Sequence, residues 1–104
     1  MNPSKGRVVL IDDNQQTIEM LGAVLRRAGF AVEAFTCPTT GLEWTKQYGA
    51  DLLLTDYLMP GLNGLDLLTQ LKDIDSTLPV IVISGEGTIE AAVEAMKRGA
   101  YDFI

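Results

Sequence analysis

Polar side chains end three short apolar runs in this sequence. The runs lie at residues 7–11, 51–55 and 79–83. The acidic pair Asp12 and Asp13 follows the first run, Asp56 ends the second and Ser84 ends the third. In an open α/β sheet, the carboxyl ends of the strands form the ligand crevice. The pattern therefore predicts one crevice that holds three carboxylates and a hydroxyl.

Helical patterns separate the apolar runs. The first helix should start near Gln15, the second should span about 39–48, and the third should start near Leu65. In the fourth, an apolar stripe at helical spacing consists of Ile89, Ala92, Val93 and Met96. Thr39 or Thr40 is expected to cap the second helix. Glycines at C-terminal caps are expected to end three helices, at positions 29, 49 and 99.

Alternating strands and helices predict a single α/β domain over residues 1–104. The expected strands are 7–11, 31–35, 51–55, 79–83 and 101–104. Right-handed crossovers favour a doubly wound parallel five-stranded sheet in the flavodoxin-like order 2-1-3-4-5. In that order strand 1 lies beside strand 3, which brings Asp12 and Asp13 next to Asp56.

Composition excludes several classes of function. The net charge is −6 and the eight basic residues are scattered, so we expect no direct nucleic-acid binding by this segment. No apolar run approaches the roughly 20 residues that cross a bilayer, so we expect no membrane contact. Histidine is absent, which excludes a catalytic triad with a histidine base. The single cysteine, Cys37, fits a reducing compartment, and we expect a cytoplasmic protein.

The acidic groups suit Mg²⁺ and phosphoryl chemistry. Neighbouring carboxylates raise each other's pKa, and a hard divalent cation relieves their repulsion. The backbone carbonyl of Leu58 can add a further oxygen ligand. With the ion bound, Asp56 can act as a nucleophile toward a phosphoryl group, and Ser84 can donate a hydrogen bond to one phosphoryl oxygen.

Each of these residues also has a purely structural interpretation. Asp13 or Asn14 can cap the first helix, and Ser84 before Gly85 is typical of a turn. The functional interpretation is favoured because all of the groups follow strands 1, 3 and 4 on the side of the sheet where ligands bind.

Four segments of the chain resemble the receiver domain of two-component response regulators. The resemblance covers the whole chain and is carried by VVLIDDN at 8–14, DLLLTDYLMPGLNG at 51–64, PVIVISG at 79–85 and AAVEAMKRGAYDFI at 91–104. The last segment is particularly similar to receivers of transcription activators.

The resemblance implies a role for each candidate residue. Asp56 would be the phosphoacceptor, and Asp12, Asp13, Asp56 and the Leu58 carbonyl would bind Mg²⁺. Ser84 would be the switch hydroxyl and Tyr101 the switch aromatic, although Tyr101 can equally be a half-buried strand residue. A sensor histidine kinase would supply the phosphoryl group. A surface of helix 4 and strand 5 would control an output domain, with transcription regulation as the expected output. The same surface could instead form a homodimer.

The resemblance also implies features that do not occur in this sequence. Receivers carry a lysine after the fifth strand, then a proline and a fifth helix, so we expect a receiver domain that is incomplete at its C-terminus. Lys97 is interpreted as a solvated residue near a helix end rather than a substitute for that lysine.

Three other functions are alternatives to a phosphoacceptor domain. A pseudo-receiver would bind partners without phosphorylation. An aspartyl-phosphate phosphatase needs a general acid two residues after the nucleophile, where this chain has Leu58. A flavodoxin-like cofactor site needs a phosphate-binding glycine loop after strand 1, and the acidic pair has the wrong charge. From position alone, Leu58 and Glu86 are expected to tune water access to the acceptor.

Overall fold

The computed structural model describes residues 5–85 and 88–104. The strands are β1 (Arg7–Ile11), β2 (Ala31–Phe35), β3 (Leu52–Asp56), β4 (Val80–Ile83) and β5 (Asp102–Phe103). The helices are α1 (Gln15–Arg27), α2 (Pro38–Tyr48), α3 (Gly64–Ile74) and α4 (Ile89–Lys97). None of the helices in these described ranges has the length and apolar character that a membrane span requires.

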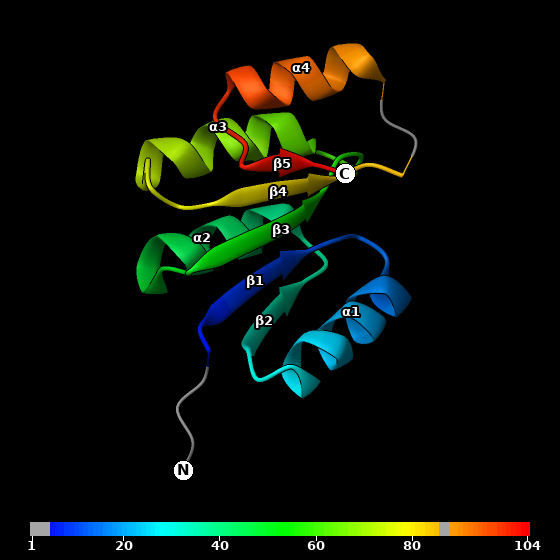
Figure 1. Cartoon of the computed structure of the whole chain (residues 1–104), viewed down its shortest axis with the longest axis vertical. Coiled ribbons are helices and arrows are strands. Elements are labelled where there is room, and N and C mark those ends of the chain that lie inside the picture. Colours follow the sequence, from blue (N-terminus) through cyan, green and yellow to red (C-terminus); the bar gives the residue numbers. More distant parts are fainter. Residues whose placement is uncertain (1–4, 86–87) are drawn as a thin grey trace.

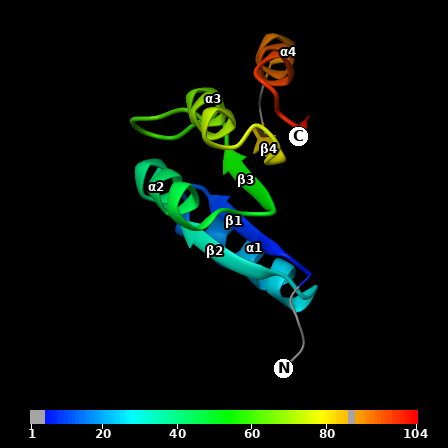
Figure 2. The same ribbon diagram turned by 90° about the vertical axis from the view of Figure 1, so that its left-hand side faces the viewer.

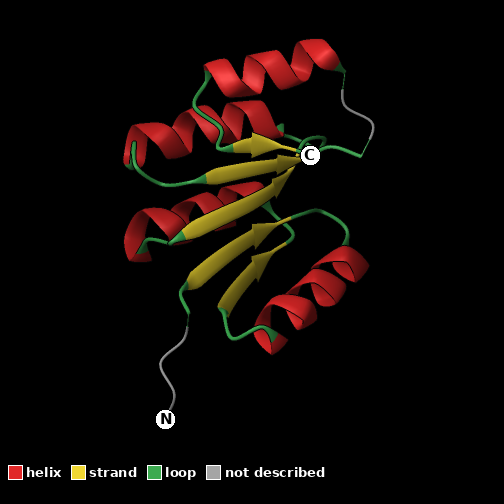
Figure 3. Ribbon diagram, viewed as in Figure 1, coloured by secondary structure: helices red, strands yellow, loops and turns green. Residues whose placement is uncertain are grey.

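The five strands form one parallel sheet in the order β2-β1-β3-β4-β5. All five arrows point the same way, and the chain's C-terminus lies at their carboxyl ends (Figure 3). The predicted doubly wound sheet and its strand order are therefore confirmed. In the register, Ile11 of β1 lies opposite Thr55 of β3, and Asp56 lies opposite Ile83 of β4. This register aligns the ends of the three strands that carry the polar groups.

Helices cover the sheet unequally. On one face α2 and α3 lie side by side against the sheet, and α4 runs along the β5 edge (Figure 1). On the other face α1 packs on β1 and β2 (Figure 2). Alternation along β1 serves both faces, because Val9 and Ile11 join the larger core and Leu10 joins the core under α1. The fully buried leucines of α3 that complete the larger core are Leu67, Leu68 and Leu71.

Helix ends follow the predicted glycine signals. Gly29, Gly49 and Gly99 all have positive φ, at 103°, 76° and 98°, where a side chain would be strained. The predicted cap of α2 is wrong. Its N-cap is Cys37, which makes no side-chain capping bond, and Pro38 takes the first helical position, where a missing N–H costs nothing.

The predicted apolar stripe of α4 does not face the core. Ile89 is 81% exposed, Val93 47% and Met96 50%. The buried residues of α4 are instead Ala91 and Ala95. The helix contacts α3 and β5, buries only small side chains there and displays its larger apolar side chains outward.

Candidate functional site

Three carboxylates meet at the carboxyl end of the sheet. Carboxylate oxygens of Asp12, Asp13 and Asp56 lie within 4.8 Å of one another. Asp12 and Asp13 follow β1, Asp56 is the last residue of β3, and these strands are neighbours in the sheet. The meeting of the acidic pair with Asp56, as the sequence predicts, follows directly from the strand order.

Asn14 caps α1 and leaves the acidic pair outside the helix. Its side-chain oxygen accepts a hydrogen bond from the Thr17 N–H over 3.1 Å. Asp12 in turn accepts from the Asn14 N–H over 2.9 Å, which fixes the turn between β1 and α1. Of the two capping candidates, Asn14 therefore takes the structural role and Asp13 stays exposed beside Asp12 and Asp56.

Asp56 is half-buried and accepts hydrogen bonds from both of its neighbours in the chain, Thr55 and Tyr57. Its Oδ1 accepts a hydrogen bond from the Tyr57 N–H over 2.8 Å. Its backbone carbonyl accepts one from the hydroxyl of Thr55, a fully buried side chain, over 3.1 Å. The carboxylate is thus oriented while it remains open to solvent on one side.

Burial and mutual repulsion favour the protonated forms of Asp12 and Asp56. The pKa of Asp56 is raised, first by partial burial and then by the charge of Asp12, against the lowering effect of the Tyr57 N–H. The pKa of Asp12 is also raised, chiefly by burial and further by Asp13, against the Asn14 N–H. A divalent cation is the natural partner for such a donor set, because it offsets the repulsion between oxygen ligands.

The loop after Asp56 returns close to the backbone of Asp56. The Gly64 N–H donates to the Tyr57 carbonyl over 2.8 Å, and Asn63 caps α3 through the Asp66 N–H. A Cβ added at Gly64 would lie 2.5 Å from the carbonyl oxygen of Asp56. Only glycine fits this approach, which sets the start of α3 beside Asp56.

The acidic cluster does not include the other predicted site residues among those that the structure describes. The Ser84 hydroxyl donates to the Ile104 carbonyl over 3.3 Å, toward β5. Tyr101 is 71% exposed and therefore is not the half-buried strand aromatic of the alternative interpretation. The side chain of Leu58 is exposed beside Asp56, and Glu86 lies outside the described residues.

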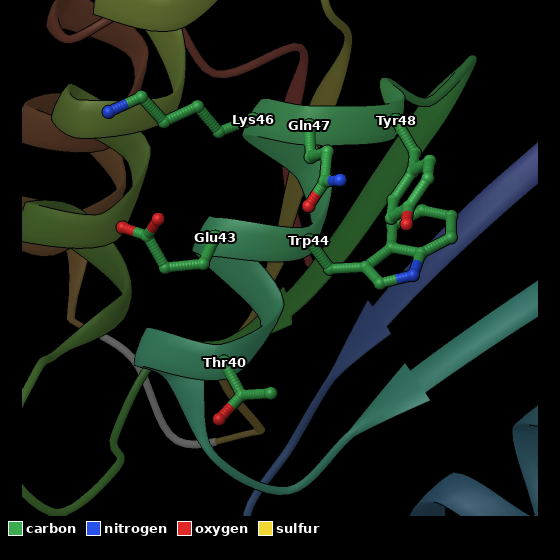
Figure 4. Close-up of a pocket in the computed structure, with 6 residues that line it drawn as sticks. All are labelled: Thr40, Glu43, Trp44, Lys46, Gln47 and Tyr48. Carbon is green, nitrogen blue, oxygen red and sulfur yellow. The ribbon is translucent and has the colours of Figure 1, made fainter.

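A surface depression elsewhere is unrelated to the acidic cluster. It lies along α2 and is lined in part by Trp44 and Tyr48, whose ring centroids are 4.8 Å apart (Figure 4). The Arg7 guanidinium lies 5.2 Å from the Trp44 ring centroid. Arg7 opens β1, and its side chain bonds the Tyr48 carbonyl, so this aromatic group ties α2 to the amino end of the sheet, opposite the carboxylates.

The family of this chain follows from a comparison over almost its whole length. Residues 8–104 match the model of the response regulator receiver domain. The chain belongs to this family. Receiver domains are regulatory domains of two-component signalling, and this receiver domain carries its acidic cluster where the strand order brings β1 and β3 together.

Two curated relatives of this receiver domain are named transcriptional regulatory proteins. It is 38% identical over 97 residues to the phosphoglycerate transport system transcriptional regulatory protein PgtA of Salmonella typhimurium, covering 93% of this chain and 23% of PgtA. It is 36% identical over 101 residues to the transcriptional regulatory protein FixJ of Bradyrhizobium diazoefficiens, covering 97% of this chain and 49% of FixJ. The chain therefore spans half or less of the length of these relatives.

Solved structures share the fold of this receiver domain. A response regulator receiver domain protein from Clostridium thermocellum superimposes with a TM-score of 0.90 at 30% identity, covering 94% of this chain and 79% of that one. NtrX from Brucella abortus, solved in complex with ADP, gives a TM-score of 0.87 at 33% identity, covering 95% of this chain and 23% of NtrX.

Three contributors to the site escaped the sequence analysis as site residues. In the sequence, Thr55 belongs to the apolar run 51–55. Tyr57 and Gly64 belong to the segment that follows Asp56. Their roles depend on distances across the loop after β3. The signal that could have marked Gly64 is its position at the start of a helix that must return to the end of β3.

Proposed function

We propose that this receiver domain accepts a phosphoryl group on Asp56 from a phosphohistidine of a sensor kinase. The supporting observation is the half-buried Asp56 carboxylate, which ends a central strand with two further carboxylates within 4.8 Å. Such an arrangement serves little structural purpose, because the like charges oppose one another and raise the pKa of Asp12 and Asp56.

The proposed transfer uses one carboxylate oxygen of Asp56 as the nucleophile. This oxygen attacks phosphorus, an O–P bond forms and the N–P bond of the phosphohistidine breaks. The electron pair of that bond stays on the imidazole nitrogen, which takes a proton from water. The other oxygen, Oδ1, keeps its bond from the Tyr57 N–H, so the carboxylate needs no reorientation during the step.

Mg²⁺ would be held by Asp12, Asp13, Asp56 and the carbonyl of Leu58. When bound, the ion neutralises charge on the carboxylates and on the phosphoryl oxygens. The donor set fits this ion, because it consists of hard oxygen ligands whose mutual repulsion a cation relieves.

Ser84 and Tyr101 would carry the signal away from the acceptor. The Ser84 hydroxyl would leave the Ile104 carbonyl and donate to a phosphoryl oxygen, and Tyr101 would change its rotamer in response. The exposed side chains of α4 and the start of β5 offer the surface that would change, namely Ile89, Val93, Met96 and Tyr101. That surface would act on an output domain or a second copy of the chain, in the cytoplasm, with transcription as the regulated process.

The test is the mass of the intact protein after incubation with acetyl phosphate and Mg²⁺. We expect one phosphoryl group on the native chain and on Asp73→Asn, an exposed carboxylate of α3, and none on Asp56→Asn. Label on Asp56→Asn would contradict the site. An unlabelled native chain would instead favour the pseudo-receiver, and continuous phosphate release would favour a phosphatase.

A further inference from the structure

Tyr57 connects the acceptor to a strand that β3 does not touch. Its ring packs edge-on against the ring of Phe103 in β5, with centroids 5.8 Å apart and planes at 68°. In the sheet, β4 lies between β3 and β5. The two rings therefore meet over β4, on the face that carries α3 and the larger core.

The backbone of Tyr57 is bonded at both of its polar groups. Its N–H lies 2.8 Å from Asp56 Oδ1 and 2.9 Å from the Ile83 carbonyl, and so is shared between the carboxylate and the β4 ladder. Its carbonyl accepts from the Gly64 N–H over 2.8 Å. A displacement of this residue would alter the hydrogen bond that orients Asp56 and the start of α3 together.

The ring of Tyr57 packs against the larger core and thereby helps to hold the backbone of this residue in place. Tyr57 and Phe103 are both partly buried and pack against the same apolar cluster. Aromatic pairs prefer this edge-to-face geometry, and the preference adds to the burial of their area. Loss of the ring would remove the contact with Phe103 and leave the Tyr57 backbone to its hydrogen bonds with Asp56, Ile83 and Gly64.

We propose that Tyr57 is a positioning residue for phosphoryl transfer, and that the Tyr57–Phe103 ring pair couples the orientation of Asp56 to the position of β5. The inference rests on the proposed function for its kinetic consequence. The coupling is reciprocal: a change at β5 alters the acceptor as much as a change at the acceptor alters β5. This route to β5 is separate from the hydrogen bond of Ser84 to Ile104.

A double-mutant cycle tests the coupling. The variants are Tyr57→Leu, Phe103→Leu and the double variant, assayed for the initial rate of labelling by acetyl phosphate with Mg²⁺ under conditions where circular dichroism shows each to be folded. Each single change should slow labelling by about two- to tenfold. This range is the stabilisation free energy of about one aromatic pair converted to a ratio of rates. The double variant should be no slower than the slower single variant, because both remove the same contact.

Two further variants separate positioning from general packing. Tyr57→Phe keeps the ring and should recover most of the rate lost in Tyr57→Leu. Tyr48→Leu removes the contact with Trp44 at the other end of the sheet and should label at the native rate. Native labelling by Tyr57→Leu, or effects of the two single changes that multiply in the double variant, would overturn the proposal.

Hydrogen exchange at the amide of residue 57 gives a readout that needs no phosphorylation. Tyr57→Leu and Phe103→Leu should both exchange faster at this amide than the native chain, while Tyr48→Leu should not. Unchanged exchange in both variants would overturn the positioning role even if the chain is labelled. Faster exchange in these two variants, together with a native chain that takes no label, would retain the positioning role and reject the phosphoacceptor function.

Discussion

The hydroxyl of Ser84 donates a hydrogen bond to the backbone carbonyl of Ile104, with 3.3 Å between the two oxygens. The same carbonyl accepts from the Ser84 N–H over 2.8 Å, which extends the pairing of β4 with β5 past the ends of both strands. Movement of the hydroxyl toward Asp56 would remove one of these two bonds. Such a movement would link the state of Asp56 to the end of the short strand β5.

Replacing Ser84 should separate phosphorylation from its consequences at β5. Ser84→Ala removes the proposed donor to the phosphoryl group, and hydrogen bonds to charged groups are strong, so labelling by acetyl phosphate should slow by about tenfold. Ser84→Thr keeps the hydroxyl and should restore most of the rate. Amide exchange at β5 should respond to labelling in the native chain and in Ser84→Thr, but not in Ser84→Ala. An equal response in all three would exclude Ser84 from the coupling.

Gly64 should tolerate no side chain. In Gly64→Ala the new Cβ would lie 2.5 Å from the Asp56 carbonyl oxygen and 3.0 Å from the Tyr57 Cα, so the backbone must shift. Overpacking of this kind costs about 1–3 kcal/mol, and we expect that loss in the free energy of unfolding measured in urea. Labelling of Asp56 should also weaken, because the shift displaces the residues that hold its carboxylate.

The matched control for Gly64 lies in α1. At Gly22 an added Cβ would lie 3.1 Å from the end of the flexible Arg26 side chain and 4.0 Å from Val32 Cγ1, which is ordinary contact. Alanine is favoured over glycine inside a helix by about 1 kcal/mol, so Gly22→Ala should leave the chain as stable as the native one or stabilise it. A similar loss in both variants would mean that the close approach to Asp56 is not the cause.

The fold and the acidic cluster were predictable because both depend on periodic patterns. Apolar runs and glycine caps locate the strands and helices, and the strand order then brings Asp56 to Asp12 and Asp13 without further information. The contacts around Asp56 were not predictable in the same way. The approach of Gly64 and the ring pair of Tyr57 with Phe103 arise from loop geometry, which has no periodic signature.

The orientation of α4 shows where periodicity fails. The stripe of larger apolar residues gave a strong helical signal, yet those residues are exposed and Ala91 and Ala95 face inward. Hydrophobic periodicity identifies a helix but assumes that the larger side chains are buried. The side chains that α4 buries are small, and Arg98 at its C-cap adds polar contacts to Asp66 and Thr69 of α3.

Arg98 should hold α4 against α3. Its guanidinium donates to Glu94 over 3.0 Å, to Asp66 of α3 over 3.3 Å and to Thr69 of α3 over 3.4 Å. Because the side chain is partly exposed and its ion pairs are screened by solvent, Arg98→Ala should reduce the free energy of unfolding only slightly. Exchange of the α4 amides should nevertheless become faster, since few apolar contacts hold this helix.

Two comparisons define the role of Arg98. Arg27 occupies the last turn of α1 and is exposed, so Arg27→Ala changes the same charge near a helix end without touching α3. Exchange in α4 should stay at the native level in that variant. Arg98→Lys keeps the charge but not the planar fork, and it should restore only part of the protection. Full protection in Arg98→Ala would show that the alanine contacts suffice.

Metal and pH should act on stability through the same carboxylates. The folded state raises the pKa of Asp12 and Asp56 above their ordinary value of 3.8, so it favours their protonated forms. The stability that these groups contribute is complete below pH 3.8 and is lost as the pH rises through the raised values. At neutral pH without metal, Asp56→Asn should therefore melt at a higher temperature than the native chain. That difference should shrink as the pH falls toward 3.8.

Addition of Mg²⁺ should reverse the order of the two proteins at neutral pH. The native chain gains stability from a ligand that binds only its folded state, whereas Asp56→Asn has lost one carboxylate and should gain less. On acidification the gain should disappear, because protonated carboxylates bind the ion poorly. Thermal unfolding at several pH values, with and without Mg²⁺, measures both effects. Equal stabilisation of the native chain and Asp56→Asn would place the ion away from the acidic cluster.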